Sequence, residues 1–167
     1  KRDEGEFVCE CSDIDDIIVF RKDGKMTVSK VQQKAFFGKD IIHIAVWKKD
    51  DRRTIYNFMY RDGKNGGANI KRFAVTSITR DKEYDLTKGT PGSETLYFSA
   101  NPNGEAEVVT VNLRALERLK KLKFDVDFSE LAVKGRDAQG NVATKYPVKK
   151  VELKSAGVST LSARKIW

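Results

Sequence analysis

Residues 58–73, with the sequence FMYRDGKNGGANIKRF, contain the kinds of side chain that can hold a phosphate group. Three glycines, four cations and three aromatic rings fall within these sixteen residues. The stretch lacks the GxxxxGKS or GxxxxGKT order of a nucleotide-binding loop, and its adjacent Gly66 and Gly67 do not fit a dinucleotide fingerprint. It predicts instead a glycine-rich strand that a long polyanion can approach closely, because glycine has no Cβ. The cations beside that approach are Arg61, Lys64, Lys71 and Arg72.

The rest of the chain offers little for catalysis. His43 is the sole histidine and lies in the apolar run IIHIAVW, which favours a position in or beside the core. The acids of CSDIDDI (residues 11–17) lack the glycine and the terminal glutamate of a calcium loop. Cys9 and Cys11 have no second pair to complete a zinc site, which indicates two reduced thiols. We therefore expect no catalytic residue, no metal and no cofactor in this chain.

Positive charge is concentrated in two blocks of the sequence, within a net charge of +8. Residues 21–80 hold fifteen cations and five acids, a balance of +10, and residues 131–167 hold eight and two, a balance of +6. Residues 1–20 and 81–130 are acidic, with balances of −5 and −3. If folding joins the basic blocks, they form a band of one sign that suits nucleic acid; the alternative is that the charge serves solubility alone.

Four segments alternate apolar and polar residues on both sides of a polar turn that contains glycine, which predicts four β-hairpins. Their turn glycines, spaced 39, 41 and 36 residues apart, are Gly24, Gly63, Gly104 and Gly140. With further strand-like runs at residues 40–47 and 72–80, each period has room for roughly four strands, the size of a propeller blade. We predict an all-β, propeller-like ring of about four four-stranded blades, in preference to a β-sandwich, which has no fixed period.

One segment, VNLRALERLKKLKF, departs from this alternation. Leucines recur at every third position, and they are Leu113, Leu116, Leu119 and Leu122. This spacing predicts a short helix or 3₁₀ connector near residues 113–123. Its leucines are expected to cap the core of the sheets, and a partner-binding helix is the alternative.

A chain of 167 residues suits one hydrophobic core, so we expect a single domain over residues 1–167. No apolar run is long enough to cross a membrane, and the start KRDEGEF is too charged for a signal peptide. We therefore expect a cytoplasmic protein with no membrane partner. We also expect a fragment of a longer polypeptide, since the chain starts without Met.

Cations surround three of the four predicted turns, and in a ring of equivalent hairpins these turns would share one rim. Such a rim binds phosphates without reading base sequence, and its affinity falls steeply with salt. Glu105 and Glu107 at the third turn would interrupt it. The expected DNA contacts are Lys22, Lys25, Lys30, Arg61, Lys64, Lys71, Arg72, Lys145, Lys149 and Lys150.

Six motifs cover nearly the whole chain: DDIIVFRKDGKMTVSKV, FFGKDIIHIAVW, RTIYNFMYRDGKNGGANIKRF, RDKEYDLTKGTPGS, YFSANPNGEAEVV and GVSTLSARKIW. Together they resemble the C-terminal domain of bacterial type IIA topoisomerase A subunits, most of all topoisomerase IV or DNA gyrase A subunits of the Bacteroides group. The resemblance implies a β-pinwheel, a propeller-like ring of four-stranded blades whose basic outer edge binds and bends double-stranded DNA.

The resemblance also implies that the chemistry of the parent enzyme, an ATP-dependent DNA topoisomerase, lies outside this chain. In the family, the DNA-cleaving tyrosine belongs to the core of the A subunit, while ATP and Mg are used through other domains and the B subunit. The nearest counterpart of the basic box of gyrase is RDGKNGG (residues 61–67), whose cations stand in a different order. Decatenation and relaxation of the topoisomerase IV type are therefore expected rather than supercoiling. The alternative function is a protein-interaction propeller whose basic rim docks acidic partner proteins.

Overall fold

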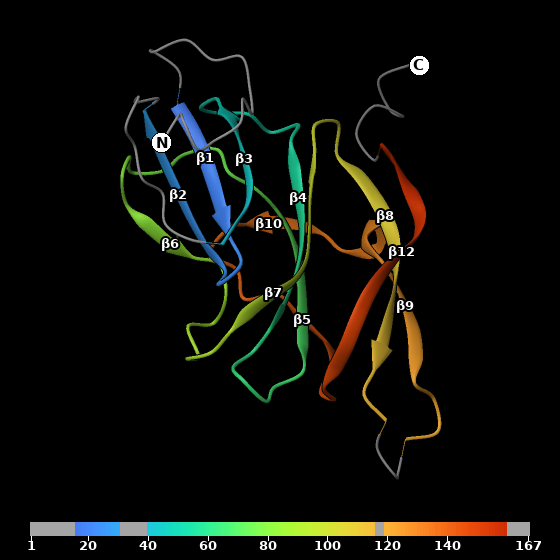
Figure 1. Ribbon diagram of the computed structural model, residues 1–167. Helices are drawn as coiled ribbons and strands as arrows, with labels where there is room; N and C mark the ends of the chain where they lie inside the picture. Colours follow the sequence, from blue (N-terminus) through green and yellow to red (C-terminus); the bar gives the residue numbers. More distant parts are fainter. Residues whose placement is uncertain (1–15, 31–39, 116–118, 160–167) are drawn as a thin grey trace.

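The computed structural model describes residues 16–30, 40–115 and 119–159, except the side chains of 157–159, and these residues form three β-sheets (Figure 1). The first sheet, in the order β3-β1-β2-β6, contains β1 (Asp16–Arg21), β2 (Lys25–Lys30), β3 (Ile41–Trp47) and β6 (Glu83–Asp85). The second, in the order β10-β5-β4-β7 with β11 also on β5, contains β4 (Ile55–Arg61), β5 (Ala68–Ala74), β7 (Glu94–Asn101), β10 (Val133–Gly135) and β11 (Asn141–Thr144). The third, in the order β12-β8-β9, contains β8 (Glu105–Leu113), β9 (Lys123–Asp127) and β12 (Val148–Ser159). A 3₁₀ turn, η1 (Phe128–Glu130), follows β9.

The second sheet is the middle layer of the fold (Figure 1). Its strand β4 reads IYNFMYR and is buried along almost its whole length, because its two faces pack against different neighbours. Tyr56 and Phe58 share a core with Phe20 of the first sheet. Met59, on the opposite face, packs in a second core with Val109 of the third sheet. Apolar burial on both faces of the middle sheet therefore joins the three sheets.

Two of the four predicted hairpins are confirmed. β1 pairs with β2 around Gly24, and β4 pairs with β5 around Gly63, both antiparallel. These glycines have φ angles of 83° and 81°, which residues with a Cβ rarely adopt. The segment after β6 joins the two turns, since the Leu86 amide donates to the Gly24 carbonyl and the Gly63 amide donates to the Ser93 hydroxyl.

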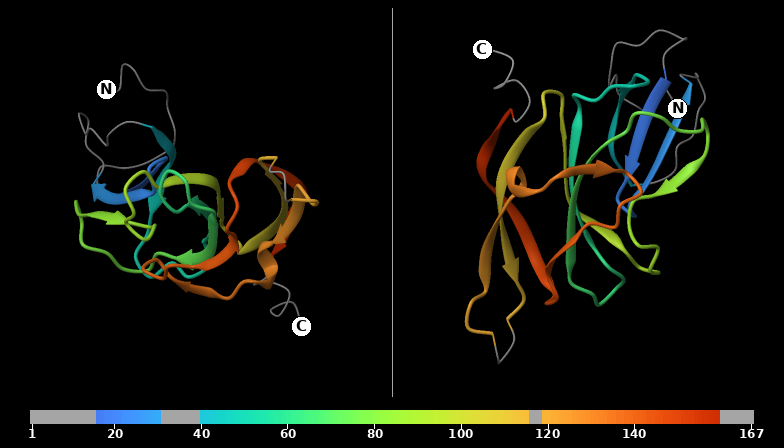
Figure 2. Two further views of the ribbon diagram at one scale, coloured as in Figure 1. Left: turned by 90° about the horizontal axis from the view of Figure 1, so that it is seen from below. Right: turned by 180° about the vertical axis from the view of Figure 1, so that it is seen from behind.

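The other two predicted hairpins are wrong. A turn does form at Gly104, but β7 before it pairs with β4 in the second sheet, whereas β8 after it lies in the third. β10 and β11, on either side of Gly140, each pair with β5. The chain thus runs from the third sheet back to the second before β12 returns to the third (Figure 2, right). The strands after Gly104 therefore add to the second and third sheets and do not form a separate hairpin around Gly140.

The all-β class is confirmed, but the prediction of about four four-stranded blades is not. The described residues form sheets of four, five and three strands, and none of these sheets is closed. The difference arises because β10 and β11 add to the second sheet and β12 adds to the third. Ala143 of β11 and Val148 and Val151 of β12 pack against the core between these two sheets. Among the described residues, no helix is long and apolar enough to cross a membrane.

The helical connector predicted near residues 113–123 is wrong for the residues that the structure describes. β8 and β9 pair as an antiparallel hairpin, and the Leu113 amide donates to the Leu122 carbonyl. Leu113 is buried and Leu119 packs against the same core, whereas Leu122 is 38% exposed. Residues 116–118 lie outside the described part. Cross-strand pairing therefore overrides the helical spacing of the leucines.

His43 is half-buried in β3, where its ring centroid lies 5.9 Å from that of Phe20 and 5.4 Å from that of Phe98. This confirms its predicted place beside the core. Burial lowers the pKa of His43 from its ordinary value of 6.5. The predictions for Cys9, Cys11 and the acids before Asp16 fall outside the described residues.

The unfolded chain binds a proton at this histidine more tightly than the folded chain does. The stability that depends on the neutral ring is therefore present above about pH 6.5 and lost as the pH falls below it. We expect the urea midpoint of unfolding to fall between about pH 7 and pH 5, and His43→Phe to reduce that fall. An equal fall in both proteins would contradict a titrating His43.

Candidate nucleic-acid interface

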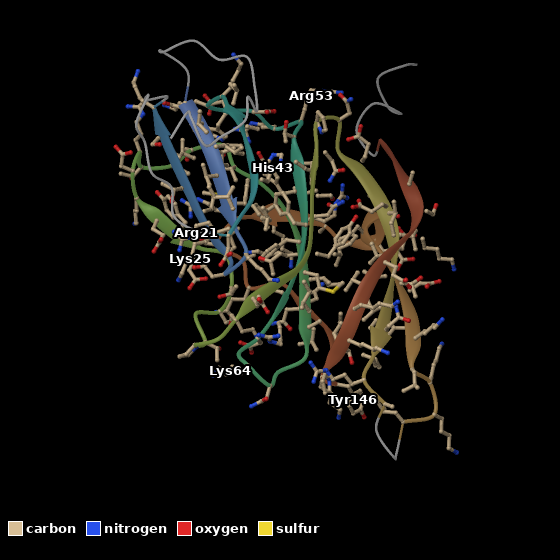
Figure 3. The ribbon with its side chains drawn as sticks, in the orientation of Figure 1. Arg21, Lys25, His43, Arg53, Lys64 and Tyr146 are labelled. Atoms are coloured by element: carbon tan, nitrogen blue, oxygen red, sulfur yellow. The ribbon has the colours of Figure 1, made fainter. Side chains whose placement is uncertain are left out.

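Cations gather at one end of the third sheet, where β8 ends and where β9 and β12 begin. Strand pairing sets Lys123 opposite Asn112 and Val148 opposite Leu113, and the Arg114 amide donates to the Pro147 carbonyl. Cations that are close in sequence to these paired residues therefore lie at the same end of the sheet. Tyr146, which is labelled in Figure 3, marks this end. We call this set the basic end: Arg114, Lys120, Lys121, Lys123, Lys145, Lys149 and Lys150.

The side chains of the basic end are exposed to solvent. Lys150 lies 3.3 Å from Glu152, and the other six make no salt bridge with any residue that the structure describes. Tyr146 stands among them, 37% exposed, with the Lys145 ammonium 5.8 Å from the centroid of its ring. Cations without carboxylate partners beside an exposed ring offer phosphate contacts and a surface on which a sugar or a base can rest.

Acidic residues occupy the middle and the far end of the same sheet. Hydrogen bonds from Lys154 and Thr110 lower the pKa of Asp125, and the field of Lys121 adds to this effect. The far end, where β8 begins and β9 ends, carries Glu105, Asp127 and Glu130. The third sheet therefore has a basic end and an acidic end, and a polyanion is attracted to only one of them.

Three of the expected DNA contacts, at the turns of the first and second sheets, are engaged in ion pairs. Lys22 and Arg61 approach the carboxylate of Glu94 at 3.5 and 3.3 Å. Lys25 lies 2.9 Å from the carboxylate of Asp85. These cations remain at the surface, but their charges are balanced by acids of the same loops.

Two further expected contacts are exposed. Lys64 lies at the second turn (Figure 3) and makes no salt bridge with the described residues. Lys30 ends β2, the strand that starts at the Gly24 turn, and so lies at the opposite end of the first sheet from that turn. The turns do not form the single rim that the sequence predicts, because the Gly104 turn also lies at the far end of β4 from Gly63.

Lys71 and Arg72 are only 3% and 2% exposed, so the prediction that they contact phosphate is corrected. The Lys71 ammonium donates to the carbonyls of Arg136 and Ala138, both at 2.7 Å. The Arg72 guanidinium donates to Asn57 Oδ1 at 2.8 Å. Because alternate residues of a strand point to opposite faces, these neighbours serve the two different interfaces of the middle sheet.

The space in front of the turn glycines is filled by the chain itself. A Cβ on Gly67 would lie 2.0 Å from the Thr144 carbonyl oxygen, and one on Gly63 would lie 2.9 Å from the side chain of Thr90. Residues 90 and 144–145 therefore occupy the space beside the glycines in which the sequence predicts a polyanion. The same packing places Lys145 beside the second turn.

Sequence reasoning missed four cations of the basic end, which are Arg114, Lys120, Lys121 and Lys123. They fall in the segment for which the leucine spacing predicts a helix, and cations on the solvent face of a helix indicate no particular site. The alternation KLKF at residues 121–124 is the signal that favours a strand edge instead.

Comparison with protein families adds an independent finding. Residues 2–156 match the family described as the topoisomerase C-terminal domain of Bacteroidota, which is most of the chain. A search of curated proteins gave no match.

Proposed function

Because this chain belongs to the topoisomerase C-terminal domain family of Bacteroidota, we propose that it holds double-stranded DNA for its parent enzyme and does not cut it. The duplex is bound through its phosphates, without base readout. The bound segment is thereby positioned for ATP-dependent strand passage by the core of the A subunit and the B subunit.

The observation that supports this proposal most strongly is the basic end of the third sheet. Lys121, Lys145 and Lys149 are exposed there without a described salt bridge, next to the exposed ring of Tyr146. Lysine ammonium groups are point charges that suit phosphate oxygens and do not discriminate between bases. This chemistry fits a protein that must hold any DNA sequence.

A non-catalytic role is supported by the surroundings of the tyrosines in the middle sheet. Tyr60 donates its hydroxyl to the Gln139 carbonyl at 2.6 Å, and Tyr97 donates to the carboxylate of Glu107. Burial, followed by the hydrogen bond to Glu107, raises the pKa of Tyr97, which makes its hydroxyl a poor nucleophile at neutral pH. In the proposal, strand cleavage belongs to the A-subunit core.

Within the proposal, topoisomerase IV-type decatenation and relaxation is favoured over supercoiling. The segment RDGKNGG, nearest to the gyrase basic box, has Arg61 tied to the carbonyl of Gly63 at 2.7 Å and to that of Gly92 at 3.1 Å. Only Lys64 remains there as a cation without a described salt bridge. This segment therefore offers little to a duplex wrapped around the domain.

Binding to duplex DNA should depend on salt and not on sequence. We expect the logarithm of the association constant, measured by fluorescence anisotropy on two unrelated duplexes of about 30 base pairs, to fall linearly with the logarithm of salt concentration and with equal slopes. Lys121→Glu/Lys145→Glu/Lys149→Glu should weaken binding to both duplexes alike. Circular dichroism of the variant would show that it is folded.

The alternative, in which the basic end docks acidic proteins, makes a different prediction for the same titration. DNA affinity would then be no better than that of an unrelated protein with a net charge of +8, and reversing three exposed lysines elsewhere on the surface would weaken it as much as the triple variant does. Competition with heparin separates the two functions further, because a duplex-holding surface should retain DNA at heparin concentrations that displace a merely charged protein.

A further inference from the structure

The distribution of charge over the three sheets points to where the duplex lies, an inference that rests on the proposed function. We propose that the duplex crosses the strand ends of the third sheet in one short, straight contact, and that the ion-paired cations at the turns of the first and second sheets take no part in binding.

The turns of the first and second sheets form a rim whose charges, apart from that of Lys64, are already balanced. Arg21 bonds to Asp23 and Glu83 at 2.7 and 2.8 Å, and Lys88 lies 4.0 Å from Asp62. The ion pairs of Lys22, Lys25 and Arg61 lie along the same rim. Beyond about 8 to 10 Å, salt screens what remains of such balanced charge, so the rim attracts DNA weakly. We call these residues the paired rim.

The polarity of the third sheet fixes the direction of the duplex axis. A duplex laid along the strands would run from the basic end to Glu105, Asp127 and Glu130 at the acidic end, which make no salt bridge with the described residues. Asp125, in the middle of the sheet, is already paired with Lys154. A duplex laid across the strand ends meets Lys150, Lys123 and their neighbours in one row. The two lysines lie on either side of Asn112 in the strand register, on β12 and β9. Like-charge repulsion excludes the first orientation and leaves the second.

The size of the basic end limits the length of the contact. Adjacent strands are about 4.8 Å apart, so three strand ends with lysine side chains reaching outward on both sides span roughly 20 to 30 Å. That length corresponds to about 6 to 9 base pairs at 3.4 Å each. Beside the paired rim, Lys64 is a single exposed cation without a described salt bridge. Lys30, Lys48 and Lys49 are also exposed without one, but they lie at the opposite end of the first sheet from that rim. Among the described residues, no row of such cations therefore continues the basic end along the rim to offset the cost of bending the duplex.

A comparison of two variants with equal loss of charge tests the location of the contact. Lys121→Gln/Lys145→Gln/Lys149→Gln removes three cations from the basic end, and Lys22→Gln/Lys25→Gln/Lys88→Gln removes three from the paired rim. We expect the first variant to lower the slope of log K against log salt by about 2.7, and the affinity at 0.1 M salt on the order of 10²-fold. The second should change the slope by less than 1.

Equal losses in the two variants would overturn the location while leaving DNA binding itself intact. No binding by the unsubstituted domain would instead overturn the proposed function, so the two failures are distinguishable.

Duplex length provides a second test that needs no substitution. Affinity per site should reach its plateau at about 10 to 12 base pairs, and energy transfer between dyes at the two ends of a 30-base-pair duplex should not change on binding. A plateau that requires more than about 25 base pairs, or a shortened end-to-end distance, would overturn the short, straight contact.

Discussion

Arg72→Met is expected to lower the free energy of unfolding by about 3 to 5 kcal/mol, because it removes one partner from a buried charged network. The Arg72 guanidinium donates to Asn57 Oδ1 at 2.8 Å and to the Gly104 carbonyl at 3.1 Å. Asn57 in turn donates to the carboxylate of Glu107 at 2.6 Å. Glu107 is only 5% exposed, so the substitution leaves a carboxylate in the interface between the second and third sheets without its balancing cation.

Urea unfolding followed by tryptophan fluorescence measures this loss, and Arg52→Met is the matched control. Arg52 is exposed, and the same substitution there should leave the midpoint of unfolding nearly unchanged. Adding Glu107→Gln to Arg72→Met should recover part of the loss, because the unbalanced charge disappears while an acceptor for Tyr97 or Asn57 remains. Strict additivity of the two substitutions would show that their charges are not coupled.

Local signals predicted the parts of the fold that local chemistry decides. Asp23-Gly24 and Asp62-Gly63 supply the positive φ that a hairpin turn needs, and both hairpins form. The step at Gly104 supplies the same conformation, yet its flanking strands join different sheets. A turn sequence determines where the chain reverses direction. The strand with which the next segment pairs depends instead on where the apolar face of that segment can be buried, and this is decided by distant residues.

The same limit explains which site residues could be found from the sequence. Lys145, Lys149 and Lys150 follow the Gly140 turn and are exposed as expected. Lys71 and Arg72 look identical to them in composition, but their strand lies in a sheet covered on both faces. A run of cations therefore indicates a surface only when one face of the strand is free, and the pairing of β5 with strands that arrive from residues 133–144 is not visible in the local pattern.

Two-sided burial of β5 also explains how the chain tolerates a lysine in its interior. The Lys71 ammonium lies 5.1 Å from the centroid of the Phe73 ring and donates to the carbonyls of Arg136 and Ala138. Burial lowers the pKa of Lys71 from 10.5 to about 8, against the opposing fields of Asp137 and Asp85. Lys71 thus holds residues 136–138, which return from the third sheet, against the middle of the fold.

Stability should therefore rise with pH between about 8 and 10. The folded chain releases the Lys71 proton near pH 8, while the unfolded chain keeps it to about 10.5, so in this window the unfolded state binds more protons. The expected gain from pH 7 to pH 10 is about 2 to 3 kcal/mol in the free energy of unfolding, from the difference between these two values. The neutral amine still has two N–H groups for the two carbonyls. Deprotonation therefore removes the free-energy penalty of burying a charge and keeps both hydrogen bonds.

Urea unfolding at pH 7, 8, 9 and 10 measures this rise, and Lys71→Met should abolish it, because methionine keeps the apolar stem beside Phe73 and cannot titrate. The series ends near pH 10 because burial also raises the pKa of Tyr56, whose ionisation in the unfolded state would lower stability above that pH. Lys64→Met is the control, since Lys64 is exposed at the adjacent turn and its removal should leave the rise intact. If the unsubstituted domain and Lys71→Met show the same dependence on pH, Lys71 is not the group that titrates, and the hold of β5 on residues 136–138 does not involve a buried charge.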